Sequence, residues 1–171
     1  MLVENREWSC EAVCRLIERG HRRIAVVGGG SAVLTARERL AGYLQALEQN
    51  GILYDSTLAR SGELTFTFGH ESSRALMALD DPPTAIFSTN HDITMGVITA
   101  VRELGLRNPE DVDVFGYDCV SVYTAMSPPL PVVHQPEREI GRTAAACLID
   151  RLNGYEGPSR HHRLPCELVC Q

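Results

Sequence analysis

Four short apolar runs recur along this chain at intervals of about 30 residues, the length of a strand–helix–strand unit. They are IAVVGG (24–29), TLARSG (57–62), TAIFST (84–89) and VDVFGY (112–117). Between them, apolar residues recur with the period of a helix, at 36–47 and at 93–104. Strands that alternate with helices, and runs that are apolar on both faces, predict a parallel sheet covered by helices on each side.

The remaining segments fit the same pattern. Val13, Leu16 and Ile17 share one face of a predicted N-terminal helix, and a further helix is expected at 137–152. The spacing of Thr35 and Glu38 predicts a capping box, and the glycines at 20, 51 and 105 follow predicted last turns. The proline-rich stretch at 128–136 resists helix, and a last strand is expected at 164–169. The prediction is an α/β fold, a three-layer α/β/α Rossmann-like arrangement.

Composition excludes several functions. The chain has 171 residues, 44% of them hydrophobic, which suits one domain with a real core. Its formal charge of -6 opposes direct binding to nucleic acid. All 16 basic residues are Arg, so the chain has neither the Lys of a phosphate-binding P-loop nor a Lys for Schiff-base chemistry. No apolar run reaches about 18 residues, so no membrane segment is expected.

The six cysteines, at 10, 14, 119, 147, 166 and 170, do not have the spacing of a zinc site. A chain with no signal peptide at its start places them in a reducing, cytoplasmic compartment by default. We expect small core residues rather than metal ligands, and no cofactor.

Polar residues follow the predicted strands at the point where each becomes a helix. Arg39 and Thr35 come after the first strand, Asn90 after the third and Asp118 after the fourth, and 64–68 follow the second. Carboxyl ends of parallel strands meet at one edge, where ligands bind. Guanidinium, carboxamide and carboxylate together suit a hydroxyl-rich ligand. Taken singly, Asn90 could be a helix cap, Asp118 a turn residue and Arg39 a surface charge.

Four stretches then show a family resemblance. RLIERGHRRIAVVGG (15–29), TARERLAGYLQAL (35–47), residues 80–118 and PPLPVVHQPEREIGRTAAACLIDRL (128–152) resemble, in order and spacing, the effector-binding region of lactose-repressor and galactose-repressor (LacI/GalR) transcriptional regulators. The resemblance covers nearly the whole chain.

The resemblance implies a periplasmic-binding-protein-like (type I) fold in incomplete form. Residues 1–130 and 162–171 would form the C-terminal subdomain, and residues 131–161 would be the crossover strand and helix of an otherwise missing N-terminal subdomain. In this family, the effector binds in the cleft between the subdomains. The helix-turn-helix, the hinge and the first half of the core would lie outside this chain, so operator DNA would be contacted only through that missing part.

By the same resemblance, Arg39 would hold effector hydroxyl or carboxylate groups, Asp118 would be the ligand carboxylate, Asn90 would close the cleft and Thr35 would be an occasional contact. Leu64, with Phe66 and Phe68 nearby, stands where many members carry an aromatic residue that stacks on the effector. Cys119 replaces a second acidic residue.

The resemblance also implies a homodimer formed through 93–101 and 120–126, and a sugar-like effector such as a sugar, polyol or nucleoside. Two alternatives remain open. One is a sugar receptor of a transporter, which shares the fold. The other is a Rossmann-like enzyme, although His91 and the adjacent Asp92 would point about 100° apart on a helix. No G-x-S-x-G or H-E-x-x-H motif supports catalysis.

Overall fold

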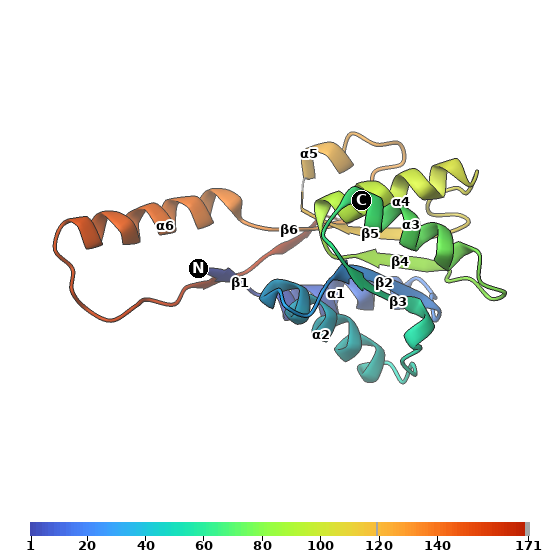
Figure 1. The fold of residues 1–171 in the computed structure, drawn as a ribbon, viewed down its shortest axis with the longest axis horizontal. Coiled ribbons are helices and arrows are strands. Elements are labelled where there is room, and N and C mark those ends of the chain that lie inside the picture. Colours follow the sequence, from blue (N-terminus) through green and yellow to red (C-terminus); the bar gives the residue numbers. More distant parts are fainter. Residues whose placement is uncertain (119, 170–171) are drawn as a thin grey trace.

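The computed structural model describes residues 1–118 and 120–169, and for Val120 and Ser121 it describes the backbone alone. The helices are α1 (Asn5–Glu18), α2 (Leu34–Gln49), α3 (Phe66–Met77), α4 (His91–Glu103), α5 (Val120–Tyr123) and α6 (Glu137–Leu152). The strands are β1 (Leu2–Val3), β2 (Ile24–Gly29), β3 (Ala59–Gly62), β4 (Ala85–Ser88), β5 (Asp113–Tyr117), β6 (Val132–His134), β7 (Arg163–Leu164) and β8 (Glu167–Val169). The predicted α/β fold is confirmed (Figure 1).

Six strands form the main sheet, in the order β3-β2-β4-β5-β6-β8. All neighbours are parallel except β6 and β8, which are antiparallel. The strand order reverses between β2 and β4, because the chain moves outward to β3 and then returns to the other side of β2. Such a switch point leaves a crevice at the carboxyl ends of the two strands.

Helices cover both faces of this sheet, as the two-sided apolar runs predict (Figure 1). Val26 and Phe87 point to one face, where they pack with α1 and α2. Val27 and Ile86 point to the other face, where they pack with α3 and α4. This alternation follows from the period of two along each strand, so both faces of one strand contribute to a core.

The helices of each pair approach closely because glycines lie where they cross. A methyl group on Gly96 of α4 would lie 2.2 Å from the carbonyl oxygen of Phe66 in α3, and one on Gly69 would lie 2.4 Å from that of Ile93. On the other face, a methyl group on Gly42 of α2 would lie 2.3 Å from the carbonyl oxygen of Arg6 in α1. A side chain at any of these positions would push the helices apart.

Two boundaries differ from the sequence prediction. Residues Ser56–Leu58 form a 3-10 turn, so the strand predicted at 57–62 begins at Ala59. The single strand predicted at 164–169 is two short strands, and Pro165 lies between them. Proline has no amide hydrogen to donate, so one continuous ladder cannot pass through it.

A projecting arm, which we define as α6 with the chain that returns from it through β7, extends away from the main sheet (Figure 1). Its β7 pairs in parallel with β1, forming a separate two-stranded sheet. No residue of α6 is fully buried. Strand β6, which leads into α6, still belongs to the main sheet through β5. The division of the chain into two subdomains stays a prediction.

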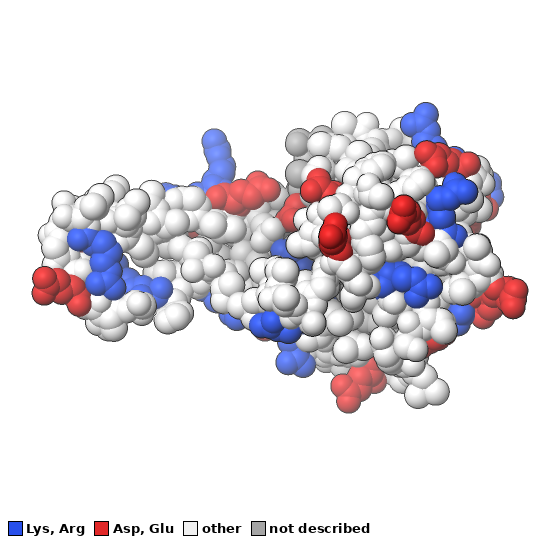
Figure 2. All heavy atoms as spheres, viewed as in Figure 1, with Lys and Arg blue, Asp and Glu red and all other residues white. Residues whose placement is uncertain are grey.

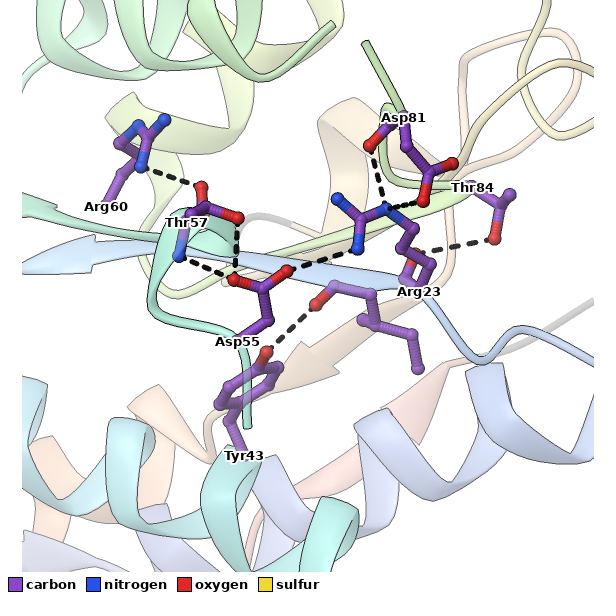
Figure 3. Close-up of polar contacts among 8 residues, drawn as sticks. Arg23, Tyr43, Asp55, Thr57, Arg60, Asp81 and Thr84 are labelled. Carbon is purple, nitrogen blue, oxygen red and sulfur yellow. Dashed lines mark hydrogen bonds and ion pairs between the residues drawn. The ribbon is translucent and has the colours of Figure 1, made fainter. Parts of the chain in front are cut away.

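Ion pairs and hydrogen bonds between residues of the protein occupy the edge of the sheet at which the strands begin (Figure 3). Arg23 donates from Nη1 to Asp55 at 3.1 Å, and from Nε to the carbonyl oxygen of Asp81 at 2.7 Å. The Tyr43 hydroxyl donates to the carbonyl oxygen of Ile24 at 2.9 Å. Side chains of the protein therefore occupy this edge, and the polar residues predicted to bind a ligand lie at the opposite edge.

We predict that Gly96→Ala lowers the free energy of unfolding by about 1–3 kcal/mol, because the added methyl group overpacks the crossing of α3 and α4. Urea denaturation monitored by circular dichroism measures the change. Gly141→Ala in α6 is the matched control, since nothing lies within 4 Å of its added methyl group. Equal destabilisation by both substitutions would contradict the packing argument.

We also predict that Asn90→Ala lowers the free energy of unfolding by about 1 kcal/mol, because its side-chain oxygen accepts from the amide of Ile93 at the start of α4. Thr35→Ala serves as control and should change it by less than about 0.5 kcal/mol. The same denaturation measurement applies. An equal loss from both substitutions would contradict the capping argument for Asn90.

Candidate functional site

The predicted site residues lie at the carboxyl edge, around the switch point between β2 and β4. Arg39 is in the second turn of α2, which follows β2, and Asn90 immediately precedes α4, which follows β4. Asp118 follows the last residue of β5, the next strand in the sheet. Parallel strand direction brings these three residues to one edge, although 79 positions separate the first from the last (118 − 39).

Arg39 is buried, with a relative exposure of 7%, so the alternative of a surface charge is wrong. Its Nη1 donates to the carbonyl oxygen of Thr89 at 2.6 Å, and its Nε donates to Oδ1 of Asn5 at 2.9 Å. The guanidinium carbon lies 3.7 Å from the centre of the Tyr117 ring. A guanidinium needs such partners when it leaves water.

These contacts join the three predicted residues indirectly. Thr89 immediately precedes Asn90, and Tyr117 immediately precedes Asp118. Arg39 therefore contacts the residue immediately before each of the other two predicted site residues, Asn90 and Asp118. Its ring partner Tyr117 is fully buried, and burial raises the pKa of the Tyr117 hydroxyl well above its usual range.

Asn90 is the helix cap that the sequence suggested. Its backbone is extended, with φ -162° and ψ 154°, and its side-chain oxygen accepts from the amide of Ile93 at 3.2 Å. The side chain is only half-buried. Its amide nitrogen can still donate to a ligand at this edge, because capping uses the oxygen alone.

Asp118 has a φ of 67°, in the left-handed region that Asp adopts more readily than most residues. Its amide donates to the carbonyl oxygen of Val133 at 2.8 Å. Its carboxylate accepts from Nε2 of Gln135, which follows β6. Gln135 was not among the predicted site residues, although it stands in the proline-rich segment at 128–136.

The remaining candidates have other surroundings. Thr35 does not cap α2, because the capping position is Val33 and carries no side-chain hydrogen bond; the predicted capping box is wrong. Glu38 instead accepts from Asn5 and Arg163. The local spacing gave no sign of these distant donors.

Leu64 is partly buried and packs over Gly29 at the end of β2, where a methyl group on the glycine would lie 2.8 Å from Leu64 Cδ2. Phe66, the first residue of α3, is 44% exposed and stacks on His70 with the ring centres 6.1 Å apart. Phe68 packs over Gly62. Of these aromatic side chains, Phe66 is the one that presents its ring to solvent.

A small cavity of about 190 Å³ lies beside Thr35 and Gln135. Its lining includes Thr35, Gln135 and Ile140, together with Met1–Val3 at the start of the chain. Within the described residues, no group of three or more His, Cys, Asp or Glu side chains is placed to hold a metal ion. The polar groups at this edge are hydrogen-bond donors and acceptors suited to an uncharged polar ligand.

The visible surface carries charges of both signs, and two of the cysteines are buried. On the face seen in Figure 2, acidic and basic side chains alternate without a continuous basic patch. Cys10 and Cys166 are buried, and burial raises the pKa of each thiol to about 11, so both stay protonated at neutral pH. Cys119 and Cys170 lie outside the described residues. No helix in the part that the structure describes is long and apolar enough to cross a membrane.

The sequence matches a known domain family and known transcriptional regulators. Residues 13–170 match the family model of the periplasmic binding protein-like domain. The repressor CytR of Escherichia coli strain K12 is 34% identical over 167 residues, which are 98% of this chain and 49% of the repressor. The regulator CelR of Thermobifida fusca is 37% identical over 152 residues, 89% of this chain and 45% of the regulator.

Solved structures agree with this match. A regulatory protein of the LacI family from Chloroflexus aggregans superposes with a TM-score of 0.90 at 31% identity, covering 99% of this chain and 61% of that one. The complex of the transcriptional regulator CelR with cellobiose superposes with a TM-score of 0.91 at 34% identity, covering 98% and 51%. The chain thus spans about half the length of the curated relatives it matches. It belongs to the periplasmic binding protein-like domain family, in the form that LacI-family transcriptional regulators carry.

Proposed function

We propose that this chain is the ligand-sensing part of a bacterial LacI-type transcriptional regulator. It binds a small hydroxyl-rich effector, a sugar or a related polyol or nucleoside, at the edge that holds Arg39, Asn90 and Asp118. The observation that carries the proposal is the buried Arg39, which contacts the residues immediately before Asn90 and Asp118. The CelR–cellobiose complex supports the effector class, because that similar structure contains a sugar.

The chemistry of the edge fits such a ligand. A sugar hydroxyl both donates and accepts a hydrogen bond, and the edge offers an amide donor on Asn90 and an acceptor on Asp118. Arg39 and Asp118 carry opposite charges, so the pair is neutral overall and does not require a charged ligand. Leu64, Phe66 and Thr35 form the outer part of the proposed contact surface, where apolar groups of the effector would lie.

Signalling follows from a shift between open and closed states of the core. An effector held between this chain and the other half of the core favours the arrangement that it binds better, and this alters the spacing of DNA-binding domains elsewhere in the regulator. For the intact regulator, operator DNA, a cytoplasmic location and a homodimer through 93–101 and 120–126 belong to this proposal. The role is regulatory and not enzymatic. A transporter receptor is less favoured, since the matched relatives are transcriptional regulators.

We predict that sugars bind this chain weakly, because the proposed effector site lies between two halves of the core and this chain supplies only one of them. In amide NMR spectra, millimolar cellobiose, ribose or a purine nucleoside should shift signals at 35–39, 89–92 and 117–118, with a dissociation constant above about 1 mM, equivalent to less than about 4 kcal/mol of binding free energy. Calorimetry should therefore detect no micromolar binding. Micromolar affinity for any sugar would contradict the interpretation that this chain supplies only half of the effector site.

Two aspartate substitutions test where the sugar binds in this titration: Asp118→Asn, and Asp111→Asn as its control. The first changes the proposed ligand carboxylate and should abolish the shifts. The second changes an exposed carboxylate that pairs with Arg107 at 2.7 Å, so its shifts should match those of the unmodified chain. Shifts that map to another surface, or that survive Asp118→Asn, would overturn the proposed location.

We further predict that the chain self-associates through α6. Leu148, Ile149 and Leu152 are 62%, 55% and 78% exposed, and their clustering on one helix leaves an apolar surface in water. Sedimentation velocity at rising concentration should show dimers or larger species. The double substitution Leu148→Glu and Leu152→Glu should weaken them at least tenfold, whereas Leu53→Glu, at a side chain outside α6 that is 92% exposed, should not. A clean monomer at high concentration would contradict this prediction.

A further inference from the structure

A chain of hydrogen bonds connects the projecting arm to the buried guanidinium of Arg39. Arg163, in β7 of the arm, donates from Nη2 to Oε1 of Glu38 at 2.9 Å. The other carboxylate oxygen of Glu38 accepts from Nδ2 of Asn5 at 2.8 Å. Oδ1 of Asn5 accepts from Nε of Arg39 at 2.9 Å. Four side chains from α1, α2 and the arm thus form one continuous relay.

The carboxylate of Glu38 is the nearer of two acceptors that turn the Asn5 amide one way, at 2.8 Å against 3.3 Å for the carbonyl oxygen of Val3. A carboxylate only accepts hydrogen bonds, so Asn5 must turn its NH₂ group towards Glu38. Its oxygen then faces Arg39, which only donates. The Tyr117 hydroxyl lies 3.5 Å from the same oxygen, so it provides a second donor on that side. Without an acceptor at position 38, the NH₂ group of Asn5 keeps only its longer bond to the carbonyl oxygen of Val3, at 3.3 Å, so the amide is held less firmly in this orientation.

Burial makes this orientation matter. Asn5 has no exposed surface and Arg39 is 7% exposed, so neither can replace a lost partner with water. The Glu38 side chain is 17% exposed and that of Arg163 is 44% exposed, so the relay runs from the protein interior to the surface of the arm. Burial tends to raise the pKa of Glu38, but hydrogen bonds from Arg163 and Asn5 outweigh it and hold that pKa below its usual range.

We propose that Glu38 is a positioning residue of the candidate site: held by Arg163 of the arm, it fixes the Asn5 amide and so places the Arg39 guanidinium. The importance of Arg39 for an effector rests on the proposed function. The relay then makes the place of Arg39 depend on the position of the arm. Neither the capping-box pattern nor the family resemblance assigns this role to Glu38 or to Arg163.

The side-chain Nε–H of Arg39 reports directly on the relay. Its exchange with solvent can be followed by ¹⁵N NMR on the unliganded chain, with the signal assigned by its loss in Arg39→Lys. Arg163→Met and Glu38→Met should each speed this exchange about tenfold, the effect of losing roughly one supported hydrogen bond. Arg163→Lys keeps a cationic donor and should change the rate by less than about threefold.

Arg160→Met is the matched control. Arg160 is also an arm arginine in an ion pair, with Asp150 at 2.6 Å, but its partner lies within the arm and not in the main body. It should leave the Arg39 rate unchanged. The backbone amides of Ala46 and Leu47 in α2 are a second control, since a general loosening of the helix would accelerate them as well.

The proposal is overturned if Arg163→Met or Glu38→Met leaves the Arg39 rate unchanged. It is also overturned if Arg160→Met has the same effect, or if the α2 amides accelerate equally. This measurement needs no ligand, so its result is separate from the sugar titration. If the Arg39 exchange rate responds to the substitutions but no sugar shifts are seen, the proposed function is overturned and the relay stands. If sugar shifts are seen but the Arg39 rate does not respond, the relay is overturned and the proposed function stands.

Discussion

A buried guanidinium connects the ends of the central strands in this fold. Arg39 binds the carbonyl oxygen at the end of β4, covers the Tyr117 ring at the end of β5 and bonds to Asn5 at the start of α1. A charge taken out of water needs all such partners, so α1, α2 and the two strand ends can adopt only arrangements that supply them. The geometry of the carboxyl edge depends on this requirement.

Much of this architecture could be predicted from local patterns. The continuous apolar runs at 24–29 and 84–89 mark strands buried on both faces, and β2 and β4 lie there as central strands. Helical periodicity located α1, α2, α4 and α6. The Asn90 cap was also predictable, because capping joins residues only three positions apart. Each of these features depends on interactions close in the sequence.

The features that were not predicted depend on residues far apart in the chain. Thr35 and Glu38 have the spacing of a capping box, yet Glu38 binds Arg163, 125 positions away. The burial of Arg39 depends on Asn5 and Thr89, which no local pattern connects to it. The β7 pairing with β1 joins the two ends of the chain, so only the folded structure reveals it. In each of these features, contacts between residues far apart in the chain outweighed the preference of the local sequence.

Two segments next to the arm, one after β1, which pairs with β7, and one between β6 and α6, each contact one predicted site residue. Asn5, directly after β1 and Glu4, fixes Arg39, while Gln135, between β6 and α6, donates to Asp118. The amide of Asp118 also bonds to Val133 of β6, so its backbone follows that strand. A rotation of the arm would therefore alter the hydrogen bonds of both groups together. In the proposed regulator, this arrangement links the movement between halves of the core to the groups that contact the effector, without a separate transmission pathway.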